Sequence, residues 1–113
     1  MRVYVPSTLA LLAEQHADGA VLVPEVVVVA EDETEDAEYA ALMTAADAST
    51  SLLAGPGRRV VVVVELDKVP EPGWTIPFKR VAAVHVDTHD RPVDADPDED
   101  LGWFATQEIP DLV

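Results

Sequence analysis

Five consecutive valines at positions 60–64 constrain the fold of this chain more than any other feature. They lie within segment 58–66, which opens with two arginines and closes with a leucine. Side chains of a strand point alternately to its two faces, so a strand with one face in water alternates apolar and polar residues. This run has no such alternation. We therefore expect a strand at residues 58–66 with both faces buried, covered by a helix on each face or by a dimer partner.

Two helices are expected before this strand. Ser7 or Thr8 can cap the first helix, which continues to Ala17 and stops at a glycine turn. Thr34 can cap the second helix, because carboxylates in its first turn suit the positive end of the helix dipole. This second helix is expected to end before the glycine-proline turn at residues 55–57.

Further β-rich runs occupy residues 2–5, 25–30 and 80–87, and a terminal element covers 101–113. The element order is therefore β-α-β-α-β-β plus the terminal element. Strands joined through helices tend to be parallel, with right-handed crossovers. We expect an α/β fold: a small mixed, mostly parallel sheet of four or five strands with flanking helices. The alternative is an α+β two-layer sandwich that forms a homodimer over its open face.

The length of 113 residues predicts a single domain spanning residues 1–113, with a core of its own. Segment 88–100 is polar, interrupted by prolines and rich in aspartate. It carries none of the apolar periodicity of a helix or a strand. We expect it to form a mobile acidic loop.

The charge balance limits the partners of this chain. It has 22 acidic residues against seven Lys and Arg, for a net charge of −15. Such a field repels phosphate backbones and anionic lipids, so we expect neither nucleic-acid nor membrane binding. The negative charge is compatible with a basic protein partner. It is also compatible with a role in solubility alone. No apolar run approaches the ~20 residues that span a bilayer, and we expect a cytoplasmic protein.

One group of residues has the donors of a metal site. His85, Asp87 and His89 alternate, so on a strand they would share one face. Imidazole nitrogen and carboxylate oxygen suit zinc or manganese. Three ligands on one strand surround a small cation poorly, and the competing interpretation is a strand end that faces solvent. The chain has no cysteine, nucleophile motif or phosphate-binding loop, and we expect no cofactor.

Large aromatic residues mark a candidate partner-binding surface. Trp74 lies in a loop rich in proline, and Trp103, Phe104 and Gln107 lie in the closing segment. Aromatic side chains on loops and near chain ends are enriched at interfaces. Because the chain has only six aromatic residues, packing against the core is the alternative role.

Four motifs in this order resemble an actinobacterial family of unknown function. They are Met1-Arg-Val-Tyr-Val-Pro6, Glu38-Tyr-Ala-Ala-Leu-Met43, Arg80-Val-Ala-Ala-Val-His-Val-Asp87 and Trp103-Phe-Ala-Thr-Gln-Glu-Ile-Pro-Asp-Leu112. Several members of that family are longer, both between the two helices and before the closing motif. The resemblance implies an actinobacterial cytoplasmic protein and carries over no catalytic residue.

Together these features favour a small acidic protein that binds or regulates a protein partner and is not an enzyme. The surface would include Trp74, Trp103, Phe104 and Gln107. The alternative is a metal-dependent enzyme centred on His85, Asp87 and His89.

Overall fold

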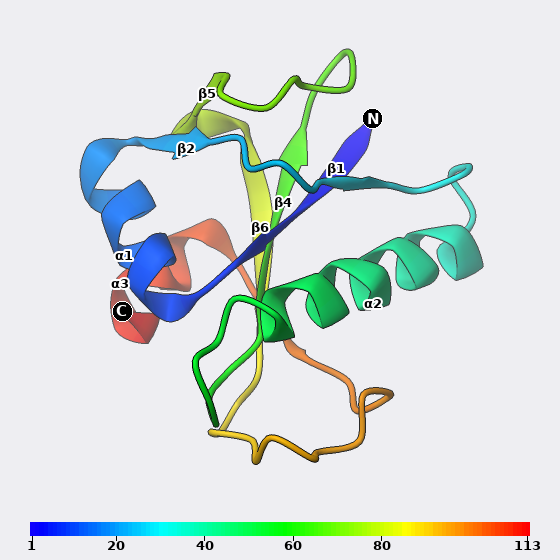
Figure 1. Ribbon diagram of the computed structural model, residues 1–113. Coiled ribbons are helices and arrows are strands. Elements are labelled where there is room, and N and C mark those ends of the chain that lie inside the picture. The colour runs from blue at the N-terminus through cyan, green and yellow to red at the C-terminus, as the bar shows by residue number, and fades with distance from the viewer.

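The computed structural model describes residues 1–113, which form a five-stranded sheet covered on both faces (Figure 1). The elements in order are β1 (Arg2–Ser7), α1 (Leu9–Asp18), β2 (Ala20–Leu22), β3 (Val28–Val29), α2 (Glu35–Thr50), β4 (Val60–Glu65), β5 (Thr75–Pro77), η1 (Phe78–Arg80), β6 (Val81–Val86), β7 (Gly102–Phe104), η2 (Thr106–Glu108) and α3 (Ile109–Leu112). The large sheet has the order β3-β1-β4-β6-β7, and β2 and β5 form a separate two-stranded sheet. No helix is both long and apolar enough to cross a membrane.

The expected mostly parallel sheet is wrong, because every pair of neighbouring strands is antiparallel. Strands β3 and β4, which α2 connects, do run in the same direction, since both are antiparallel to β1. They are not neighbours, however, because β1 lies between them. The first helix does not lead to a parallel neighbour either. After α1 the chain passes through β2 of the separate sheet, and β3 then pairs with β1 in antiparallel orientation.

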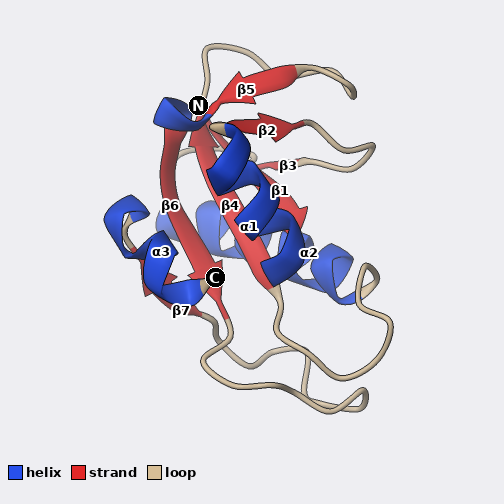
Figure 2. Cartoon of the chain, turned by 90° about the vertical axis from the view of Figure 1, so that its left-hand side faces the viewer, coloured by secondary structure: helices blue, strands red, loops and turns tan.

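The expectation that both faces of the valine strand are buried is confirmed. All five valines of β4 are at most 3% exposed. Val61 and Val63 pack against α2, where small residues such as Ala45 let the helix approach the sheet closely. The other three valines lie in the larger core cluster with residues of α1, α3 and the β2–β5 sheet (Figure 2). Because neither face of β4 is open, the two-layer alternative is also wrong.

Both predicted helix starts are confirmed. The Thr8 hydroxyl accepts a hydrogen bond from the amide of Leu11 at 3.1 Å, and the Thr34 hydroxyl accepts one from Ala37 at 3.2 Å. Gly19 ends α1 with φ of 70°, a left-handed conformation that glycine adopts without steric cost.

The predicted strands are present, but their lengths differ from those expected. The run at 25–30 pairs only over Val28–Val29. The pattern also missed β2 and β5, since three-residue strands are too short for a recognisable alternation. The terminal element is a short edge strand, β7, followed by η2 and α3.

A buried serine connects α2 to the sheet. The Ser49 hydroxyl donates to the carbonyl of Ser7 at 2.7 Å and accepts from the amide of Val60 at 2.9 Å. Ser49 and Ser7 are fully buried, so water cannot satisfy these groups instead. One hydroxyl thereby joins the end of β1, the start of β4 and the last turn of α2.

Candidate functional site

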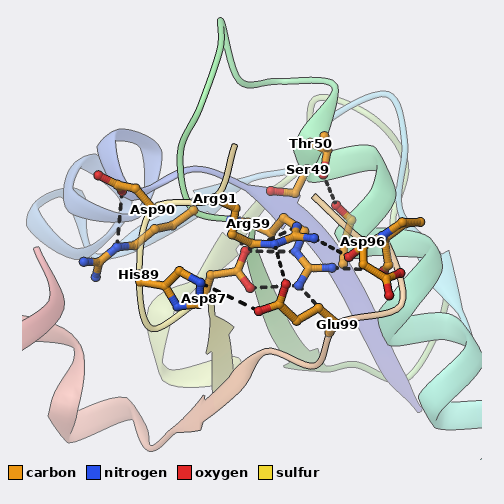
Figure 3. A network of polar contacts seen from close by, with 12 residues as sticks. Ser49, Thr50, Arg59, Asp87, His89, Asp90, Arg91, Asp96 and Glu99 are labelled. Atoms are coloured by element: carbon orange, nitrogen blue, oxygen red, sulfur yellow. Dashed lines mark hydrogen bonds and ion pairs between the residues drawn. The ribbon is translucent and has the colours of Figure 1, made fainter. Parts of the chain in front are cut away.

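The most deeply buried charges lie where β4 begins and β6 ends (Figure 3). Arg59 precedes β4, Asp87 follows β6, and antiparallel pairing of these strands brings the two side chains together. The Arg59 guanidinium donates from Nε to Asp87 Oδ2 at 2.9 Å and from Nη2 to Oδ1 at 2.8 Å. The Arg59 amide also donates to Oδ2, at 2.8 Å. The side chains of Arg59 and Asp87 are 1% and 3% exposed.

This ion pair also holds the acidic segment that follows β6. Arg59 donates to the carbonyls of Pro97 at 3.2 Å and Glu99 at 2.7 Å. Arg91, itself buried, lies 3.8 Å from Asp87 and 3.5 Å from the Glu99 carboxylate. We call Arg59, Asp87, Arg91 and Glu99 the Arg59 network. It ties residues 88–100 to the sheet, while the mobility of that segment stays a prediction.

Burial acts to lower the pKa of Arg59, but the hydrogen bond and the negative charge of Asp87 outweigh it and raise the pKa above its ordinary value. Arg59 therefore stays charged. A cleft of about 300 Å³ beside the network is lined by Arg59 and Arg91, among others. Two carboxylates balance the two guanidinium groups of the network, and Arg59 uses its donors on protein acceptors. The arrangement supports a loop, and Arg91 Nε is a buried donor in it without a hydrogen-bond partner.

The structure does not bring His85, Asp87 and His89 together around one point. Both Asp87 oxygens are bonded to Arg59. His89 is exposed, with Nε2 3.7 Å from a Glu99 oxygen. His85 lies half-buried on β6, opposite Val61 and Trp103 of the neighbouring strands. No group of three or more His, Asp or Glu side chains is arranged to hold a metal ion.

The half-buried His85 makes stability depend on pH. Burial, together with the positive charge of Arg2, lowers the pKa of His85 below its ordinary value of 6.5. The folded state therefore favours neutral His85, and this contribution to stability is present above pH 6.5. It is lost as the pH falls through 6.5 and then through the lower folded-state pKa. We expect His85→Gln to lose less stability than the wild type between neutral pH and about pH 5.

Urea unfolding at several pH values measures this difference. His89→Gln is the matched control, since it makes the same change at an exposed imidazole outside the sheet. Equal losses of unfolding free energy in all three proteins would contradict the role of His85.

The four predicted partner-binding residues do not form one surface. Trp103 lies on the edge strand β7 and is 61% exposed, and Gln107 is exposed on η2. Phe104 packs against the larger core cluster. Trp74 precedes β5 and is 40% exposed. Figure 2 shows β5 and β7 at opposite ends of the large sheet, so the two tryptophans belong to separate surfaces.

Trp74 lines a cleft of about 370 Å³ that the segment after β4 forms with β5 and η1. Three cations line it as well, namely Lys68, Lys79 and Arg80, against one carboxylate, that of Asp67. The Lys68 ammonium lies over the Trp74 ring, 5.1 Å from its centroid. We call this the basic cleft; its lining has a local charge of +2 (three cations minus one anion) in a chain of −15.

The three cations of the basic cleft differ from the other four Lys and Arg side chains of the protein, each of which forms an ion pair. Arg2 pairs with Glu65, Arg58 with Asp90, Arg59 with Asp87, and Arg91 with Asp87 and Glu99. No carboxylate forms an ion pair with Lys68, Lys79 or Arg80. This site was not predicted from the sequence. The available signal was that three of only seven basic residues fall within residues 68–80, around a tryptophan.

Comparison with known proteins gives one match. A family model described as "Family of unknown function (DUF6912)" matches residues 1–113. No curated protein and no solved structure matches the chain.

Proposed function

We propose that this chain, which belongs to a family of unknown function (DUF6912) over its whole length, is a binding protein for small organic anions. The ligand carries carboxylate or phosphate groups and occupies the basic cleft. One observation carries the proposal: the three cations that lack a carboxylate partner all line this cleft.

The charge balance makes unpaired cations unexpected in this chain. With 22 carboxylates and seven Lys and Arg, a basic side chain has many possible partners, and four arginines form an ion pair with one of these carboxylates. Lys68, Lys79 and Arg80 are exposed and keep their N–H donors for solvent or a ligand. An anion in the cleft would accept charge-assisted hydrogen bonds from these donors, which are about twice as strong as neutral ones.

The size and charge of the molecule favour a small ligand over a polymer. A cleft of about 370 Å³ lies at the lower end of the range of small-molecule sites. An extended polyanion would meet the field of the whole chain, which has a net charge of −15. Salt screens charges over about 8 Å at physiological ionic strength, so a small anion responds mainly to the nearby cations.

Trp74 adds an apolar wall to the cleft. Its ring holds the Lys68 ammonium by a cation–π contact and is 40% exposed. A ligand with an apolar part beside its acidic group would cover this ring while the acidic group meets the cations. The arrangement therefore suits an organic anion better than an inorganic one.

Tryptophan fluorescence tests the proposal. Trp103→Phe leaves Trp74 as the only tryptophan, so a ligand in the basic cleft changes the emission directly. The titrants are citrate for the carboxylate class and adenosine monophosphate for the phosphate class. We expect saturable binding of at least one of them. Lys79→Gln combined with Arg80→Gln should weaken that binding by about tenfold or more, since it removes two cations of the cleft.

Arg2→Gln combined with Arg58→Gln is the matched control, because it removes the same charge from outside the cleft. This variant should change the affinity by less than about twofold. Absence of saturation with both titrants, or equal weakening in the two double variants, would overturn the proposal.

A further inference from the structure

A second surface, separate from the basic cleft, contains a partly apolar groove. The groove has a volume of about 340 Å³ and lies between α1, β2 and the residues that follow α2. Three exposed leucines line it: Leu11, Leu22 and Leu52. Single exposed apolar residues are normal on a protein surface, but Leu22 and Leu52 are each more than half exposed and converge on the same groove.

The strand that borders this groove has an unpaired edge. On the side that faces β5, the Gly19 carbonyl accepts a hydrogen bond from the Phe78 amide at 2.9 Å. The Val23 amide donates one to the Trp74 carbonyl at 2.8 Å. In an antiparallel pair such positions alternate with residues whose N–H and C=O point to the opposite edge. Ala20 and Leu22 are those residues, given their register with β5. No strand pairs with that edge, and Ala20, Leu22 and Val23 line the groove.

The groove also contains a polar atom without a partner. Gln15 of α1 lines it, and the Oε1 atom of Gln15 is buried with no hydrogen-bond donor. Buried side-chain acceptors nearly always have a donor, so a molecule bound in the groove could supply the one that this oxygen lacks. A backbone amide or an ammonium group could do so.

The charges at the groove indicate which kind of ligand it favours. Two carboxylates line it, those of Glu14 and Asp18, and no Lys or Arg does. We propose that the groove binds an extended segment of a partner protein, which pairs with β2 as an added strand. Apolar side chains of that segment contact the three leucines, and its basic side chains face the two carboxylates. Because β2 has only three residues, few main-chain hydrogen bonds form, and the leucine contacts supply most of the affinity.

This inference does not depend on the proposed anion site, because the two surfaces share no lining residue. A displayed library of random short peptides, selected on the full chain, tests it. We expect enrichment of peptides that alternate apolar and basic residues. A selected peptide should bind Leu22→Asp about tenfold or more weakly than it binds the wild type.

Val93→Asp is the matched control, because Val93 is 76% exposed outside the groove and the charge change is the same. This variant should keep the wild-type affinity within about twofold. Amide hydrogen exchange gives a second measurement: the peptide should slow exchange at Ala20 and Leu22. The inference is overturned if no peptide is enriched, if both variants bind alike, or if exchange at β2 stays unchanged.

Discussion

Asp87→Ala is expected to lower the free energy of unfolding by about 3–5 kcal/mol, the cost of leaving one partner of a buried ion pair alone. The Arg59 guanidinium, 1% exposed in the wild type, would be left with two of its donors unpaired. The Arg59 amide would lose its acceptor as well. Since small domains have a total stability of about 5–15 kcal/mol, this variant would be partly unfolded at 25 °C or close to it. Urea unfolding followed by circular dichroism measures the loss.

Two variants distinguish the buried pair from surface charge. Asp90→Ala breaks the exposed pair with Arg58 and should cost at most about 1 kcal/mol. Arg59→Met combined with Asp87→Leu removes both buried charges and should be more stable than Asp87→Ala alone. It should not regain full stability, because the carbonyls of Pro97 and Glu99 would lose the donors that Arg59 provides. A cost of less than about 1 kcal/mol for Asp87→Ala would contradict the central role of this pair.

Ser49→Ala should give the second largest loss, about 2–4 kcal/mol. The change leaves the Ser7 carbonyl and the Val60 amide buried without their partner, and each unsatisfied group costs about 1–3 kcal/mol. Alanine otherwise suits this helix face, which already contains Ala41, Ala45 and Ala46. The loss would therefore measure the hydrogen bonds rather than a steric change. Thermal and urea unfolding should agree on its size.

Ser51→Ala is the control for this prediction, since Ser51 is exposed and its hydroxyl makes no hydrogen bond within the protein. The control should change stability by no more than about 0.5 kcal/mol. If Ser49→Ala is as mild as the control, the shared hydroxyl is not what holds α2 to the sheet.

The features of the fold that the sequence predicted correctly are local ones. The burial of both faces of β4 followed from the valine run alone, because alternation is a property of the strand itself. The caps at Thr8 and Thr34 followed from hydrogen bonds that span three residues. Strand direction is different: it depends on which strands become neighbours. Nothing in the sequence near β1 indicates that it lies between β3 and β4.

The site was harder to predict because its residues are distant in the sequence. Asp87 drew attention as a metal ligand through its neighbours His85 and His89, but its partner is Arg59, 28 residues away. The basic cleft likewise combines Lys68 and Arg80 from two sides of β5. Pattern analysis along the chain finds such charges without showing which of them are paired. Unpaired cations are a property of the folded molecule.

The position of β1 has a consequence for the order in which the fold can form. The first strand of the chain pairs with β4 over residues 60–65, so Arg2 meets Glu65, 63 residues further on. During synthesis on the ribosome, β1 therefore waits without its central partner until more than half of the chain has been made. Bringing such distant residues together costs chain entropy before their contact contributes any stability. Folding dominated by contacts of this kind is therefore slow, on the scale of milliseconds to seconds.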